Sequence, residues 1–170
     1  MVPKDQQGKK LEPLNMLKST MPNIYTEKVR KYVGREHVMQ RHVPPLDCLW
    51  NDVLHLSPID PKVLIESLRE AGMKERSFDF YKIDPAVLNQ KLTCVYLYKS
   101  LDKIKQPDES EFVPFNPESL EEWQEVPEVT KKYFKDRFDA GEKPLMFVAI
   151  PHILYRGTID VSETEIVSVS

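Results

Sequence analysis

A histidine, two tyrosines and a pair of late glutamates are the residues of this chain whose types and positions can do chemistry. His55 lies in an apolar run just before a predicted turn. A histidine at such a position can bind a ligand, or it can make a single hydrogen bond within the core. Tyr96 and Tyr98 share a strand face and would pack well with or without a ligand. Glu163 and Glu165 form a Glu-x-Glu pattern that can act on a substrate or discourage aggregation of an edge strand.

Metal, thiol and phosphate-loop chemistry find less support in the sequence. The histidines at positions 37, 42, 55 and 152 lack the spacing of a helical metal pair or a zinc set, so no metal site is predicted. Cys48 and Cys94 are interpreted as small buried apolar residues, and a cysteine nucleophile would need a histidine brought near by folding. Neither GxGxxG nor GxxxxGK occurs, so a nucleotide would be held in another way.

Three segments from residue 54 onward follow one another in an order typical of one enzyme family. The first is LHLS at 54–57, followed by a helix that ends in AGM at 71–73. The second is VYLYKSLDKI at 95–104, and the third is ETEIV at 163–167. Together they resemble the ADP-ribosyltransferase fold of the His-Tyr-Glu type, the group that includes poly-ADP-ribose polymerases, RNA 2′-phosphotransferases and many bacterial toxins. Leu56 departs from the family pattern, because many members have glycine after the histidine.

The resemblance implies an enzyme that breaks the nicotinamide–ribose bond of NAD and transfers ADP-ribose to an acceptor. Breaking this bond develops positive charge on the ribose, which a fixed carboxylate stabilises. Glu165 is the expected catalytic carboxylate. Glu109 and Glu111 remain alternatives, because they also form a Glu-x-Glu pattern.

The same resemblance implies which residues hold the cofactor. His55 would hydrogen-bond the adenosine ribose, Ser57 would help to hold the nicotinamide amide, and Tyr96 would stack on the nicotinamide ring. Ser100, at the start of the helix after the tyrosine strand, is a further expected cofactor-binding residue. The expected ligand is therefore NAD or a related nucleotide, with a protein as a possible acceptor.

The stretch 53–73 carries the clearest structural pattern and must position His55. Its apolar start predicts a short buried strand, and Asp60-Pro61 predicts a helix N-cap followed by proline at the first helical position. Apolar residues then recur along one helix side until Gly72, a natural C-terminal stop.

The rest of the chain is predicted to alternate short strands with separate helices. Helices are expected over 23–33, 86–92, 100–106, 118–126 and 128–140, and strands over 74–83, 93–98, 144–150, 151–161 and 163–169. The apolar run LMFVAI at 145–150 predicts a strand buried on both faces, with His152 in a turn after it. Residues 106–117 predict an irregular surface loop of the kind that forms a lid.

Composition limits the classes of function. Apolar residues make up 41% and charged residues 30% of the chain, as in soluble globular proteins. The net charge of −3 gives no strong attraction for nucleic acid or a membrane surface, and no apolar run is long enough to span a bilayer. We therefore expect a cytoplasmic protein.

The patterns together predict an α+β fold with a mixed, mostly antiparallel sheet and flanking helices. Residues 1–13 are expected to be a flexible tail, and residues 14–170 a single domain. Two functions are consistent with these features. One is an ADP-ribosyltransferase-like enzyme, and the other is a non-enzymatic interaction module of the same architecture.

Overall fold

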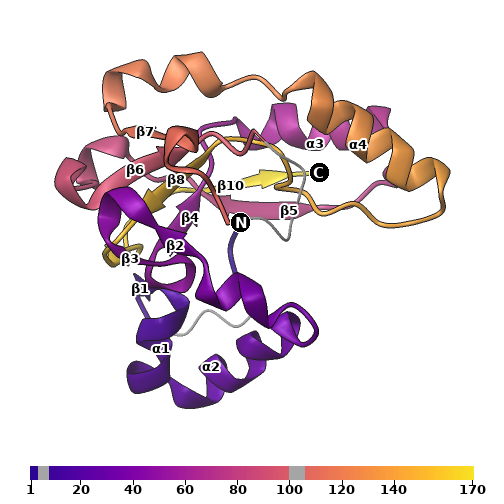
Figure 1. The fold of residues 1–170 in the computed structure, drawn as a ribbon. Helices are drawn as coiled ribbons and strands as arrows, with labels where there is room; N and C mark the ends of the chain where they lie inside the picture. The colour runs from indigo at the N-terminus through magenta and orange to yellow at the C-terminus, as the bar shows by residue number, and fades with distance from the viewer. Residues whose placement is uncertain (4–7, 100–105) are drawn as a thin grey trace.

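The computed structural model describes residues 1–3, 8–99 and 106–170, and within these ranges all strand pairs are antiparallel (Figure 1). Helices and such strands together confirm the α+β class. The predicted helix over 100–106 and Ser100 lie outside the described residues, except for Gln106.

A four-stranded sheet forms the centre of the molecule. Its strand order is β4 (Leu54–Leu56), β8 (His152–Tyr155), β6 (Thr93–Tyr96) and β7 (Phe112–Pro114). All four residues of β6 are buried, which agrees with the β-branched and aromatic sequence that predicted this strand. β7 arises within the predicted irregular loop, and Pro114 is tolerated there because β7 is an edge strand.

The prediction of a central strand over 144–150 is wrong, because β8 takes that place. Prolines at positions 144 and 151 bound the run, and Ala149 has a φ of 53°, which interrupts extended backbone. The run forms irregular chain instead, exposed at Leu145 and buried from residue 148 to 150, and the Thr130 hydroxyl of α4 donates to the Ala149 carbonyl at 2.7 Å. His152 therefore begins β8 and is not part of a turn.

The two faces of the central sheet are covered differently. The segment between residues 38 and 53 folds over one face. It contains β2 (His42–Val43), β3 (Cys48–Leu49) and short 3₁₀ turns. Cys48 in this layer and Cys94 in β6 beneath it are both buried, as predicted. The other face packs on a second cluster built around Val95, Ile153 and Phe115.

A second layer joins α3 (Pro61–Glu70) to a two-stranded sheet of β5 (Phe78–Tyr81) and β10 (Ile166–Val169). The Asp60 carboxylate accepts a hydrogen bond from the Lys62 backbone N–H at 2.7 Å, which confirms the predicted N-cap. Gly72 ends this segment with a φ of 119°, a conformation that favours glycine.

α4 (Glu128–Asp139) packs beside α3 and matches its predicted helix closely. Phe134 is fully buried at its centre, and Tyr133 and Phe138 are partly buried. Val129 is 48% exposed, because it lies in the first turn of α4, before the helix reaches the core.

Several predicted helices are 3₁₀ turns in the structure. These are η5 (Pro85–Val87), η6 (Gln90–Leu92) and η8 (Pro117–Trp123), with η7 (Glu109–Glu111) added in the acidic loop. Asp84, Asn89 and Asn116 cap three of them through their side chains. Such local side-chain bonds favour short turns over longer α-helices.

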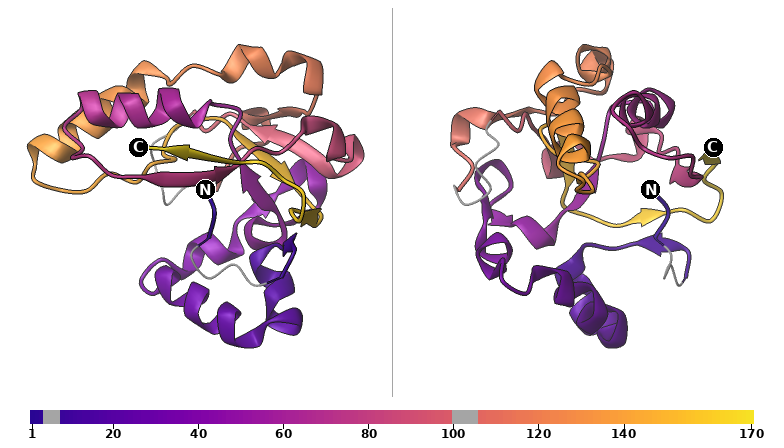
Figure 2. Two further views of the ribbon diagram at one scale, coloured as in Figure 1. Left: turned by 180° about the vertical axis from the view of Figure 1, so that it is seen from behind. Right: turned by 90° about the vertical axis from the view of Figure 1, so that its right-hand side faces the viewer.

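The N-terminal helices α1 (Leu14–Thr20) and α2 (Pro22–Val29) pack on each other and lie on the opposite side of the sheets from α3 and α4 (Figures 1 and 2). The predicted helix over 23–33 corresponds to α2 followed by the 3₁₀ turn η1 (Arg30–Tyr32). In the segment predicted as a tail, β1 (Lys10–Leu11) pairs with β9 (Ile159–Asp160). This pairing draws the first residues against the domain.

Candidate functional site

His55 and Tyr96 lie on the same face of the central sheet. His55 pairs with Leu154 across β4 and β8, and Tyr96 pairs with His152 across β6 and β8. Paired residues share a face, and so do residues two apart in one strand, so the register alone places these side chains on one side. The sequence-predicted histidine and tyrosine are thus brought together.

Trp50 fills the space between these two residues. Its ring centroid lies 4.7 Å from that of His55 and 5.4 Å from that of Tyr96, and its carbonyl oxygen lies 3.0 Å from His55 Nε2. Because a carbonyl only accepts, a neutral His55 must carry its proton on Nε2. Nδ1 is then the unprotonated nitrogen that can accept a hydrogen bond.

The aromatic side chains on this face form a ring cluster that consists of Trp50, His55, Tyr96, Tyr98, Phe112 and His152. Tyr98 stacks on Tyr96 at 5.3 Å, Phe112 lies 5.1 Å from it, and His152 lies 6.3 Å from it. Tyr98 holds this position with a φ of 51°, an unfavourable conformation for an aromatic residue. Only 4% of Tyr96 is exposed, so its ring is inaccessible in this arrangement.

The glutamates differ sharply in position. Glu165 is exposed, pairs with Lys82 at 3.0 Å, and accepts a backbone bond from the same lysine, so it belongs to the β5–β10 layer. The structure does not bring it to the ring cluster. Glu111 is buried beside Tyr96 and accepts bonds from the backbone N–H groups of Lys99 and Asp108. Of Glu111 and Glu165, Glu111 is the one that lies near Tyr96.

The remaining predicted residues have other surroundings. The Ser57 hydroxyl oxygen accepts a bond from the Ile59 N–H at 3.2 Å and so shapes the turn after β4. Glu109 is exposed in η7. Glu163 is also exposed, in the turn before β10.

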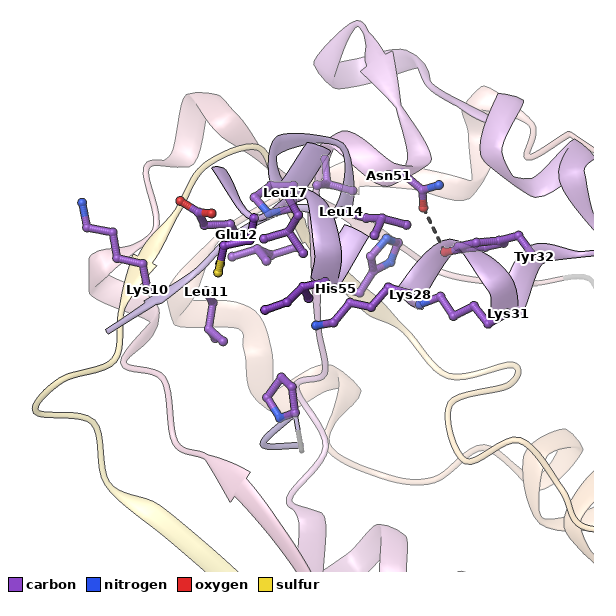
Figure 3. A pocket seen from close by; sticks show the side chains of 16 residues that line it. Lys10, Leu11, Glu12, Leu14, Leu17, Lys28, Lys31, Tyr32, Asn51 and His55 are labelled. Carbon is purple, nitrogen blue, oxygen red and sulfur yellow. Dashed lines mark hydrogen bonds between the residues drawn. The ribbon is translucent and has the colours of Figure 1, made fainter. Parts of the chain in front are cut away.

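His55 also lines a pocket of about 290 Å³ between the N-terminal helices and β4 (Figure 3). Its lining is mixed, because polar and apolar side chains contribute similar amounts of surface. The charged members are Lys10, Lys28, Lys31 and Glu12. In Figure 3 the two helical lysines lie on the same side as His55 and Tyr32, with Lys10 and Glu12 on the other side.

Asn51 forms a polar corner of this pocket. It is 3% exposed, and its side-chain oxygen accepts a hydrogen bond from the Tyr32 hydroxyl at 2.9 Å. Its side-chain nitrogen has no hydrogen-bond partner among the residues that the structure describes. A buried amide N–H without a partner costs free energy of folding.

The two histidines of the cluster differ in exposure, because His152 is partly buried and His55 is exposed. Desolvation lowers the pKa of His152 to about 4, although its Nδ1 contact with the Ile150 carbonyl opposes the shift. Desolvation and then the neighbouring His152 also lower the pKa of His55. Because His55 is exposed, solvent makes this lowering much smaller than full burial would produce. Both rings are neutral at pH 7.

The tyrosine and the thiols are protonated for the same reason. Desolvation, followed by the Glu111 carboxylate, raises the pKa of Tyr96 above its usual value. Desolvation raises the pKa of Cys48 to about 11 and that of Cys94 to about 12. Neither cysteine is therefore poised as a thiolate nucleophile.

Sequence reasoning missed the residues that complete this site. Trp50 and His152 carried signals, because an aromatic residue beside an apolar strand and the pattern HILY both suggest packing on a sheet. Glu12, Lys28 and Asn51 gave none, because the pocket joins segments that are distant in the sequence.

In the described ranges 1–3, 8–99 and 106–170, no group of three or more His, Cys, Asp or Glu side chains could hold a metal ion. No helix among the same residues has the length and apolar character needed to cross a membrane. Comparison with known proteins gave no match to a family model, to a curated protein or to a solved structure.

Proposed function

We propose that the protein binds NAD or a related nucleotide at the His55 pocket and acts on it as an ADP-ribosyltransferase-like enzyme. The observation that carries the proposal is the convergence of His55 and Tyr96 on one sheet face, with His55 at the edge of a pocket. These residues come from separate segments of the motif resemblance, and a shared face is what a joint role requires.

His55 is suited to bind a ribose hydroxyl. Its Nε2–H donates to the Trp50 carbonyl, which fixes the orientation of the ring. Its Nδ1 can accept a hydrogen bond from the ribose hydroxyl. A neutral imidazole is needed for this role, and the lowered pKa of His55 keeps it neutral at pH 7. Stacking of nicotinamide on Tyr96 additionally requires that Trp50 or Tyr98 move aside, because both cover that ring.

The carboxylate that stabilises the ribose cation has three candidates. Glu12 lines the pocket together with His55, Glu111 lies beside Tyr96, and Glu165 is in neither place. Stabilisation of developing charge depends on proximity, so Glu12 is our first candidate for a substrate held in the pocket.

The direct test is thermal unfolding with and without millimolar NAD, together with chromatography of released nicotinamide. A ligand present at 100 times its Kd stabilises the native state by about 2.7 kcal/mol, which raises the melting temperature measurably. We expect such a shift for the wild type, its loss in His55→Ala, and its retention in the control His37→Ala, since His37 is exposed in η2. The absence of both a shift and nicotinamide release in the wild type would refute the proposal.

Three matched variants then assign the carboxylate. Glu12→Gln, Glu111→Gln and Glu165→Gln each remove one charge while keeping a similar shape. We expect Glu12→Gln to reduce nicotinamide release most, and Glu165→Gln to leave it near the wild-type rate. The opposite order would favour the residue that the resemblance indicates.

A second function, a non-enzymatic interaction module, is favoured by the separation of charge along the chain. Residues 8–43 contain eight Lys and Arg against three Asp and Glu, whereas residues 106–128 contain eight acidic residues and no basic ones. Opposite surface potentials of this kind steer charged partners. This function would be indicated if the protein does not bind NAD but binds a charged protein partner with an affinity that falls as salt increases.

A further inference from the structure

The pocket beside His55 has one basic end. Lys28 and Lys31 are three residues apart along α2 and η1, a spacing that places their side chains on the same helix face. Figure 3 shows both chains extending beside the His55 ring. The ammonium group of Lys31 lies 5.0 Å from the centre of the Tyr32 ring, which helps to hold it at the pocket edge.

Asn51 lies behind the same end of the pocket. Tyr32 joins the two features, because its hydroxyl bonds to the Asn51 oxygen while its ring lies under Lys31. The side-chain nitrogen of Asn51 is fully buried, so a ligand in the pocket does not contact it. The two ammonium groups of Lys28 and Lys31 form a donor pair with affinity for an anionic oxygen group.

The charge of the pocket also favours an anion. Three lysines and one glutamate are among its described lining residues, and Glu12 already accepts a bond from the Thr20 hydroxyl at 2.6 Å. His55 adds no charge at pH 7, because its pKa is lowered. The net positive lining contrasts with the net charge of −3 on the whole chain.

Size narrows the class of ligand. A volume of about 290 Å³ lies at the small end of the usual range for ligand pockets, roughly 300–1,000 Å³. The apolar walls, which include Leu14, Leu17, Met21 and Ile24, suit a flat or apolar group. A whole dinucleotide would extend beyond this space, whereas one nucleoside with one phosphate fills it.

We infer that this pocket is a mononucleotide subsite that holds a phosphate ester, with the phosphate at the end formed by Lys28 and Lys31 and the base or sugar on the apolar wall. This inference rests on the proposed function, because it assigns one half of an NAD-type ligand to the pocket. It also defines a ligand smaller than NAD that binds by itself.

The experiment measures binding of AMP, adenosine, inorganic phosphate and NAD to the full chain by isothermal titration calorimetry. We expect AMP to bind at least tenfold more tightly than adenosine, because charge-assisted bonds to the phosphate are lost with the latter. AMP affinity should fall as salt increases, while that of adenosine should not. Inorganic phosphate alone should bind weakly, because it lacks the apolar contacts.

The double variant Lys28→Gln/Lys31→Gln should lose at least tenfold in AMP affinity and keep that for adenosine. The matched control Lys18→Gln/Lys62→Gln removes two exposed lysines outside the pocket and should bind AMP as the wild type does. Circular dichroism and melting temperature verify that both variants fold.

Failure of this inference differs from failure of the proposed function. Equal affinity for AMP and adenosine, unchanged AMP binding in the double variant, or no AMP binding in the wild type would each overturn the subsite. If NAD still stabilises the protein through His55, the proposed function survives that result. Lysine-dependent AMP binding without nicotinamide release would support the subsite and count against the transferase.

Discussion

Protonation of His152 should destabilise the folded protein at mildly acidic pH. The pKa of this imidazole is lowered to about 4 from an ordinary value of 6.5, because packing against His55, Tyr96 and Tyr98 desolvates its charged form. A histidine whose pKa is lower in the folded state contributes stability above its unfolded pKa and loses it as the pH falls. The pH window therefore runs from about 6.5 down to about 4.

The magnitude follows from these two pKa values. At 1.36 kcal/mol per pH unit, full desolvation costs roughly 3 kcal/mol at pH 4 and about 2 kcal/mol at pH 5. The ring keeps some contact with solvent, so we expect a loss of about 1–2 kcal/mol between pH 7.5 and pH 5.

Urea unfolding at the two pH values measures this loss in the wild type and in His152→Asn. Asparagine cannot titrate, yet its Nδ2–H₂ can replace the Nδ1–H that bonds to the Ile150 carbonyl at 2.7 Å. The variant should therefore lose about 1–2 kcal/mol less than the wild type on acidification. His37→Asn, at an exposed position, should behave as the wild type does.

Equal pH dependence of the wild type and His152→Asn would refute this reasoning. If the variant is too unstable to compare, a titration of the wild-type histidine ring protons by NMR gives the pKa directly. A value near 6.5 for His152 would contradict the desolvation inferred from its position.

Three further predictions concern the framework that positions the site. Phe134→Ala should lower the free energy of unfolding by about 3–5 kcal/mol, because it empties the fully buried centre of α4, whereas Val129→Ala, at an exposed position, should change it by less than about 0.5 kcal/mol in the same urea experiment. Asp60→Ala should cost about 1 kcal/mol through loss of the α3 N-cap, and Asp60→Ser should restore most of it; a full loss in both variants would contradict the capping role. Cys48 and Cys94 should resist a thiol reagent at pH 8 in the native protein and react rapidly in guanidinium, because burial raises the pKa of both; rapid native labelling would show that the layer over the sheet opens.

The order of the motifs in the sequence predicts that His55 and Tyr96 meet, but it does not predict where the carboxylates lie. His55 and Tyr96 meet because their strands flank β8 in the same sheet. Glu165 precedes a strand that pairs with β5 instead, so its place in the sequence gives no access to the same face. Glu12 reaches the pocket only because β1 pairs with β9 from the other end of the chain.

The amino-acid sequence by itself determined the elements whose signals are local. α3 follows from an N-cap, a proline, an apolar stripe and a terminal glycine, and β6 follows from six β-branched, aromatic and apolar residues in a row. α4 follows from its helical periodicity. Each of these patterns specifies backbone hydrogen bonds or a buried face within one segment, so no distant partner is needed to recognise it.

Only the tertiary structure decided which buried strand is central and which charged groups share a pocket. The run 144–150 is as apolar as a central strand, but its prolines and the left-handed Ala149 place it outside the sheet, and HILY pairs there instead. The pocket joins β1, the N-terminal helices and β4 through long-range packing. Apolar character drives burial without direction, whereas strand register and helix packing fix which side chains meet, and those depend on the whole chain.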